Sequence, residues 1–131
     1  MDYAAFCSLH QDAYLRYSEA RLRQTEAGRE AVQEALGGLL LVWTAALGSS
    51  CPAAMAWDLL KQAVLRAQQY LPSAAPPVEA AYQELPNEVA DAVVLCGDLS
   101  LSVQQAAEVM GVEEPVVRSR LRIAQRTLLA R

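Results

Sequence analysis

The sequence predicts an all-helical protein, and three observations support this fold class. Apolar residues recur at intervals of three and four through most of the chain, as on one face of a helix. Alanine and leucine dominate and only 6% of the residues are aromatic, a composition that favours helices. No segment alternates convincingly between apolar and polar residues as a strand does. With 53% apolar residues among 131, the chain can bury one core or two small ones.

Three amphipathic helices are predicted in residues 1–70. Their expected ranges are Tyr3 to Arg23, Thr25 to Leu47 and Pro52 to Tyr70. The apolar stripe of the first helix consists of Tyr3, Phe6, Leu9, Ala13 and Tyr17. Its tyrosines should pack in the core with their hydroxyls at the surface. Trp43 and Trp57 also lie on apolar stripes, so we expect both to be core residues.

A pair of glycines, Gly37 and Gly38, falls in the middle of the second predicted helix. Each glycine costs a helix roughly 1 kcal/mol relative to alanine. The pair either lets another helix approach closely or marks a kink. The apolar pattern continues through the pair, which favours close packing.

The segment 71–77 is rich in proline and is predicted to be a linker between two helical modules, residues 1–70 and 78–131. After it we expect a short helix from Val78 to Gln83. A longer helix should follow from Pro86 to Cys96, with Gly97 as its C-terminal stop.

The stretch from Leu101 to Leu128 predicts a helix-turn-helix. Ser102 and Gln105 have the spacing of a capping box. Gly111 stands where a helix ends in a left-handed residue, and Pro115 suits the start of the next helix. The apolar stripe of that second helix consists of Val117, Leu121, Ala124 and Leu128. In this motif the second helix can lie in a DNA major groove.

Positive charge is concentrated on this second helix, because the chain from Pro115 onward has five arginines and no acidic residue. The candidate DNA-binding residues are Arg118, Ser119, Arg120, Arg122 and Arg126. Early residues of a recognition helix meet base edges, whereas later ones such as Arg126 meet phosphates. The alternative is a solvated face whose arginines pair with Glu108, Glu113 or Glu114.

Other function classes find little support in the sequence. The net charge of −4 argues against a general nucleic-acid binder. His10 is the single histidine, so histidine pairs cannot build a metal site, and no glycine-rich phosphate loop is present. We therefore expect neither an enzyme nor a cofactor.

A cytoplasmic protein is expected from three further features. The odd number of distant cysteines, Cys7, Cys51 and Cys96, suggests a reducing compartment. The N-terminus has no basic region typical of a signal peptide. No uncharged apolar run reaches the roughly 18 residues that span a bilayer, so no membrane contact is expected.

Several short signatures coincide in the C-terminal part. Leu85-Pro86 precedes an apolar helix, and the sequence VRSRL from Val117 to Leu121 is followed by Ala124 and Leu128. These residues resemble region 4 of the sigma-70 family, most closely the compact extracytoplasmic-function (ECF) type of RNA polymerase sigma factor. Region 4 in that family binds polymerase and reads the −35 promoter element.

The N-terminal part resembles region 2 of the same family. Val32-Gln33-Glu34 is similar to its V-Q-E signature, Trp43 to the tryptophan after it, and Ala56-Trp57 to the A-W that opens the next helix. Region 2 binds the polymerase clamp and opens the −10 element. The resemblance implies partner contacts at Gln33 and Glu34. Because the loop Gly48 to Cys51 lacks the aromatic residues that hold a flipped base, we expect this part to bind protein without melting DNA.

Three hypotheses follow. The first is a sigma-factor-like transcription regulator that binds promoter DNA, the RNA polymerase core, or both. The second is a degenerate sigma-like adaptor that binds a regulatory protein, such as an anti-sigma or sigma-like partner, without recognising DNA. The third is another kind of helix-turn-helix regulator whose N-terminal helices serve dimerisation or sensing. We rank them in this order.

Overall fold

The computed structural model describes residues 2–70 and 81–129. Throughout these residues the secondary structure is helical and no strand occurs, which confirms the all-helical prediction. The predicted linker 71–77 and the first residues of the predicted helix Val78 to Gln83 lie outside the described residues. The last part of that helix is observed, since residues 81–84 are helical.

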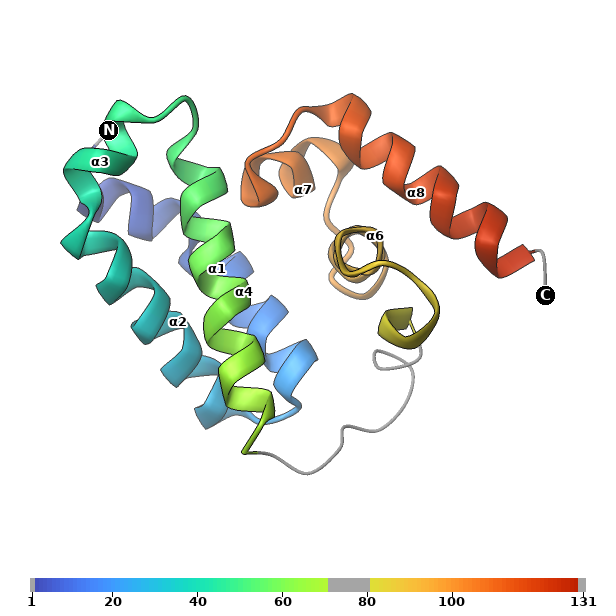
Figure 1. Ribbon diagram of the computed structural model, residues 1–131, viewed down its shortest axis with the longest axis horizontal. Helices are drawn as coiled ribbons and strands as arrows, with labels where there is room; N and C mark the ends of the chain where they lie inside the picture. The colour runs from blue at the N-terminus through green and yellow to red at the C-terminus, as the bar shows by residue number, and fades with distance from the viewer. Residues whose placement is uncertain (1, 71–80, 130–131) are drawn as a thin grey trace.

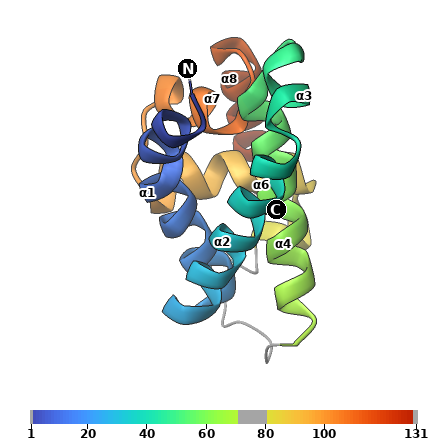
Figure 2. The same ribbon diagram turned by 90° about the vertical axis from the view of Figure 1, so that its left-hand side faces the viewer.

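Four helices make up the N-terminal half: α1 (Tyr3–Leu22), α2 (Thr25–Leu41), α3 (Trp43–Gly48) and α4 (Pro52–Gln68). Helices α1, α2 and α4 lie side by side as a bundle (Figures 1 and 2). The short α3 lies at one end of this bundle. Pro52 occupies the first turn of α4, where a missing N–H costs nothing.

The second predicted helix is interrupted, so its expected range to Leu47 is wrong. The break falls at Val42, whose φ of −116° and ψ of 20° are not helical. The break places the Trp43 ring centroid 5.7 Å from that of Tyr3 and 5.5 Å from that of Phe6. Packing of the tryptophan therefore explains the interruption. Trp43 itself is only half-buried, whereas Trp57 is a core residue as predicted.

The glycine pair lies within the continuous helix α2, and no other helix of the described residues packs against it. A Cβ placed on Gly37 or Gly38 would have no neighbouring atom within 4 Å among the described residues. The prediction of close packing at this pair is therefore wrong within the chain.

The C-terminal half contains α6 (Asn87–Val93), a π-helical turn η1 (Val94–Asp98), α7 (Val103–Met110) and α8 (Glu114–Leu129). Gly97 was expected to end the helix before the helix-turn-helix, but it lies inside η1. The left-handed residue of this connection is Ser100, with a φ of 57°. The backbone N–H of Leu101 donates to Leu95 O at 3.0 Å, which closes the turn.

One hydrophobic core passes through both halves. Its largest fully buried apolar side chains come from α1, α2, α4, η1 and α8, and they are Tyr14, Tyr17, Leu39, Leu60, Leu95, Val64, Val94 and Val117. A smaller cluster of Leu85, Val89, Ala90 and Ala124 joins α6 to α8. The two halves therefore share buried surface, and each contributes to the stability of the other.

Gly111 lies in close contact with the N-terminal bundle. Its φ of 70° is left-handed, as predicted for the end of α7. A Cβ at this position would lie 2.2 Å from Ala54 N at the start of α4. Beside this contact the Cys51 thiol donates to Gly111 O at 3.6 Å. Only glycine fits both the backbone conformation and the space.

Candidate nucleic-acid and protein interfaces

The turn and the two helices that carry the predicted DNA-binding residues are built as the sequence indicates. Ser102 Oγ accepts a hydrogen bond from Gln105 N at 3.0 Å, and Gln105 Oε1 accepts one from Ser102 N at 2.9 Å. This reciprocal capping box fixes the start of α7. The second helix, α8, begins at Glu114, one residue before Pro115.

Helix α8 separates its apolar and cationic residues onto different faces. Val117 and Ala124 are buried and Leu121 is half-buried. Leu128, which was expected to face the core, is 40% exposed. Figure 1 shows α7 and α6 on the inner side of α8, which lies at the edge of the molecule.

The predicted DNA-binding residues lie on the solvent side of α8. Arg118, Arg122 and Arg126 are exposed and spaced by four, so they form one row along the helix, with Ser119 beside it. Arg120 is half-buried and flanks the row. The structure thus brings four of the five candidates together and sets Arg120 apart.

One of the alternative ion pairs is present on this face. Arg118 Nη2 lies 3.3 Å from Glu114 Oε2, with both side chains about half exposed. An exposed pair of this spacing stabilises a helix by only about 0.3–0.5 kcal/mol. A phosphate can therefore displace Glu114. Within the described residues Arg122 and Arg126 form no ion pair.

The predicted partner-binding residues Gln33 and Glu34 are exposed on α2, in the half of the molecule away from α8 (Figure 1). Glu34 Oε1 accepts two hydrogen bonds from the Arg66 guanidinium of α4, one of them from Nε at 3.0 Å. Gln33 does not line the groove that the Glu34–Arg66 ion pair borders. The two candidate interfaces are thus separate surfaces of the protein.

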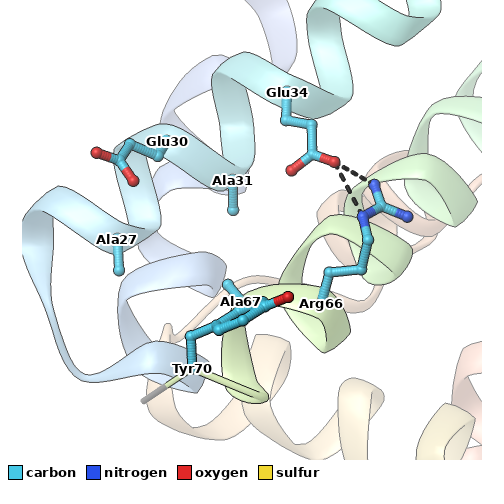
Figure 3. Close-up of a pocket in the computed structure, with 7 residues that line it drawn as sticks. All are labelled: Ala27, Glu30, Ala31, Glu34, Arg66, Ala67 and Tyr70. Carbon is cyan, nitrogen blue, oxygen red and sulfur yellow. Dashed lines mark hydrogen bonds and ion pairs between the residues drawn. The ribbon is translucent and has the colours of Figure 1, made fainter.

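The groove between α2 and α4 has a volume of about 380 Å³. Its lining residues are Ala27, Glu30, Ala31, Glu34, Arg66, Ala67 and Tyr70. Figure 3 shows small alanine side chains along its floor, the Glu34–Arg66 pair at one end and the Tyr70 ring at the other. Tyr70 is 86% exposed. An apolar floor with charged and aromatic borders suits a side chain presented by a protein partner.

A buried polar cluster that the sequence did not predict joins the two halves. Asp91 of α6 is fully buried. The Tyr17 hydroxyl donates to Asp91 Oδ1 at 2.7 Å and accepts from Arg21 Nη1 at 2.8 Å. The Tyr82 hydroxyl donates to the same carboxylate oxygen. Tyr17 and Arg21 belong to α1, so this cluster connects the N-terminal bundle with α6.

Arg21 compensates the buried carboxylate. Its Nη1 lies 3.7 Å from Asp91 Oδ1, and its guanidinium carbon lies 3.7 Å from the centroid of the Tyr82 ring. Burial raises the pKa of Asp91, while hydrogen bonds from Tyr82 and Tyr17 act in the opposite direction. Burial likewise raises the pKa values of Tyr17 and Tyr82. Both hydroxyls therefore stay protonated and remain hydrogen-bond donors. The cluster links the two halves, and Arg21 Nε and Asp91 Oδ2 within it are buried without a hydrogen-bond partner among the described residues.

The inner face of α1 differs from its predicted stripe. Leu9 is 59% exposed, whereas His10, Tyr14, Ser18 and Arg21 are buried. The hydroxyls of Tyr3 and Tyr17 were expected at the surface, but the Tyr17 hydroxyl is buried against Asp91. The Tyr14 hydroxyl is also buried, without a hydrogen-bond partner among the described residues. Phe6 and Tyr17 of the predicted stripe are buried, but the buried face also includes polar side chains that a purely apolar pattern passes over.

His10 provides a pH-dependent contribution to stability. Its ring packs against Phe6 at 4.5 Å and stacks on Tyr14 at 5.6 Å between centroids. Burial lowers the pKa of His10 below its ordinary value, an effect that Glu108 partly opposes. The unfolded chain therefore binds a proton at a higher pH than the folded chain.

We expect the unfolding free energy to fall as the pH drops below the ordinary histidine value of about 6.5, with a slope of at most about 1.4 kcal/mol per pH unit. Above that pH His10 is neutral in both the folded and the unfolded state, so its contribution to the unfolding free energy no longer changes with pH. Chemical denaturation between pH 5 and 8 measures the slope. The His10→Gln variant lacks this titration, so the part of the slope that His10 contributes should disappear with it. An unchanged slope in the variant would contradict the assignment.

No helix in residues 2–70 or 81–129 has the length and apolar character needed to cross a membrane. The same residues contain no group of three metal-ligating side chains placed to hold an ion.

Comparison of the chain with protein-family models, curated proteins and solved structures gave no match.

Proposed function

We propose that this protein is a sigma-factor-like transcription regulator that binds promoter DNA, the RNA polymerase core, or both. The observation that carries the proposal is the row of Arg118, Arg122 and Arg126 on the exposed face of α8. The capped helix α7 and the left-handed Gly111 hold this row at the edge of the molecule. An exposed cationic face on the second helix of such a motif suits a DNA major groove.

The resemblance to the ECF type of sigma factor adds polymerase as a partner. We place the polymerase contact on α2 around Gln33 and Glu34, beside the groove with Ala31 and Tyr70. Separate surfaces for DNA and for protein would allow both partners to bind the same molecule. A cytoplasmic location follows from this function.

The second candidate is a sigma-like adaptor that binds an anti-sigma or sigma-like protein without recognising DNA. The ion pair between Arg118 and Glu114 favours it, since it neutralises the first arginine of the row. Glu113, exposed just before α8, adds negative charge where a phosphate would approach. Direct DNA binding separates the two candidates.

The arginine row makes a specific prediction for DNA binding. Arg122→Ala should reduce discrimination between promoter-derived and random duplexes by roughly 1–3 kcal/mol, the value of a bidentate arginine–guanine contact. Arg126→Ala should weaken binding to both duplexes alike and flatten the salt slope by about one unit. Fluorescence anisotropy at several salt concentrations measures both effects.

Arg29→Ala, on an exposed residue of α2, is the matched control, because it removes one charge far from α8. If the folded protein bound no duplex at low salt, the adaptor would replace the regulator. Co-purification with core polymerase then tests the protein partner, and Glu34→Lys should reduce that association because it reverses the charge beside the groove.

A further inference from the structure

Two hollows lie where the N-terminal bundle meets the helix-turn-helix, beside the start of α4 and beside α7 (Figure 1). The larger hollow has a volume of about 580 Å³ and the smaller one a volume of about 290 Å³. Both are lined by His10, Ser50, Cys51 and Ala53, so they adjoin, and we call them together the junction pocket. Sites for small molecules typically have volumes of about 300–1,000 Å³.

The smaller hollow of the junction pocket is mostly apolar. Besides the four shared residues it is lined by Phe6, Trp43, Leu47 and Pro52. Trp43 is half-buried and Leu47 is 50% exposed, so part of this apolar surface is in contact with solvent. An aromatic or aliphatic group that enters the hollow removes this surface from water, which favours its binding.

The larger hollow carries negative charge. It is lined by Glu108 of α7 and by Glu113 of the turn before α8, and both side chains are exposed. Neither carboxylate forms an ion pair with a described residue. The described residues that line the two hollows include no lysine or arginine. This end of the pocket therefore attracts a cation and repels a carboxylate or a phosphate.

His10 is a buried polar side chain that lines both hollows. It is only 5% exposed, and its imidazole forms no hydrogen bond with a described residue. Buried polar groups in proteins nearly always have a hydrogen-bond partner. Because burial lowers the pKa of His10, the ring is neutral at pH 7 and one of its nitrogens can accept a hydrogen bond. The ammonium group of a ligand would supply the missing donor.

We propose that the junction pocket binds a small organic amine, with its aromatic or aliphatic body in the smaller hollow against Trp43 and its ammonium group in the larger hollow beside Glu108 and His10. The lining residues come from α1, α3, α4, α7 and the turn before α8, so the ligand holds the two halves together. The pocket includes neither the arginine row nor the groove between α2 and α4, so it is a third site, apart from the two interfaces.

Phenethylamine is the probe for this site, because it joins a phenyl ring to an ammonium group by a short chain. Two-dimensional NMR spectra of the isotope-labelled full chain, recorded during a titration without DNA or polymerase, measure its binding. We expect the amide signals of Cys51 and Glu108 and the indole signal of Trp43 to shift. The dissociation constant should be on the order of 1 mM, as befits so small a molecule. Phenylpropionate, which carries a carboxylate in place of the ammonium group, should bind at least about tenfold more weakly.

Two pairs of variants locate the amine within the pocket. Glu108→Gln should weaken binding by roughly threefold to tenfold, whereas Glu88→Gln removes the same charge from α6, outside the pocket, and should change nothing. Leu47→Lys places a cation beside the apolar hollow and should weaken binding by roughly tenfold. Leu41→Lys is its matched control, since Leu41 is exposed on α2 and does not line the pocket.

Three results would overturn the proposal. The first is no shift of any pocket signal up to about 10 mM phenethylamine, a concentration that reveals even weak binding of a small molecule. The second is equal binding of phenethylamine and phenylpropionate, which would show that the carboxylates select nothing. The third is a set of shifts confined to Glu30, Glu34 and Tyr70, which would place the amine in the groove between α2 and α4 instead.

Discussion

Replacing Asp91 by alanine should lower the free energy of unfolding by about 3–5 kcal/mol, the usual loss when one partner of a buried ion pair is removed. The variant leaves the Arg21 guanidinium buried without its carboxylate. It also leaves the hydroxyls of Tyr17 and Tyr82 without their acceptor. Urea denaturation followed by circular dichroism measures the loss.

Glu88→Ala is the matched control for this prediction. Glu88 lies on the same helix, α6, but is exposed, so its replacement should change stability by no more than about 0.5 kcal/mol. Asp91→Asn should fall between the two, because the amide oxygen still accepts from the tyrosines while the charge of Arg21 remains unpaired. Equal stability of the Asp91→Ala and Glu88→Ala variants would contradict the role of the cluster.

A double-mutant cycle shows whether Arg21 and Asp91 act together. Arg21→Met alone removes the cation from the carboxylate, and the double variant Arg21→Met, Asp91→Leu removes both charges. Because an apolar pair of similar volume can replace a buried ion pair at little cost, the double variant should be more stable than Asp91→Leu alone, which completes the cycle. The coupling free energy from this cycle measures how strongly Arg21 of α1 and Asp91 of α6 stabilise each other, and therefore how strongly this cluster holds the two halves together.

The features that the sequence predicted correctly are governed by local rules. The capping box of Ser102, the left-handed Gly111 and the first-turn Pro52 each depend on residues within one helical turn. Helix bounds at such signals were right to within one residue for α7 and α8. The arginine row was predictable for the same reason, since spacing along a single helix fixes which side chains share a face.

The features that the sequence missed depend on partners far along the chain. Tyr17 and Asp91 are separated by 74 positions, and nothing near Asp91 in the sequence marks it as buried. The break at Val42 follows from the packing of Trp43 against Tyr3 and Phe6, which a helical pattern cannot register. Tertiary packing overrides local propensity at these positions.

Substituting Gly111 by alanine should destabilise the protein by about 2–5 kcal/mol, the sum of a left-handed non-glycine residue and an overpacked contact. The φ of 70° opposes any side chain. The new Cβ would also lie 2.2 Å from Ala54 N, and because this neighbour is backbone the start of α4 has to move. The turn of the helix-turn-helix and the N-terminal bundle would then separate at this contact.

The matched control is Gly97→Ala, which adds the same methyl group in open space with no left-handed backbone. Its effect on stability should be within about 0.5 kcal/mol. A Gly111→Ala protein as stable as Gly97→Ala would show that the two halves do not depend on this contact.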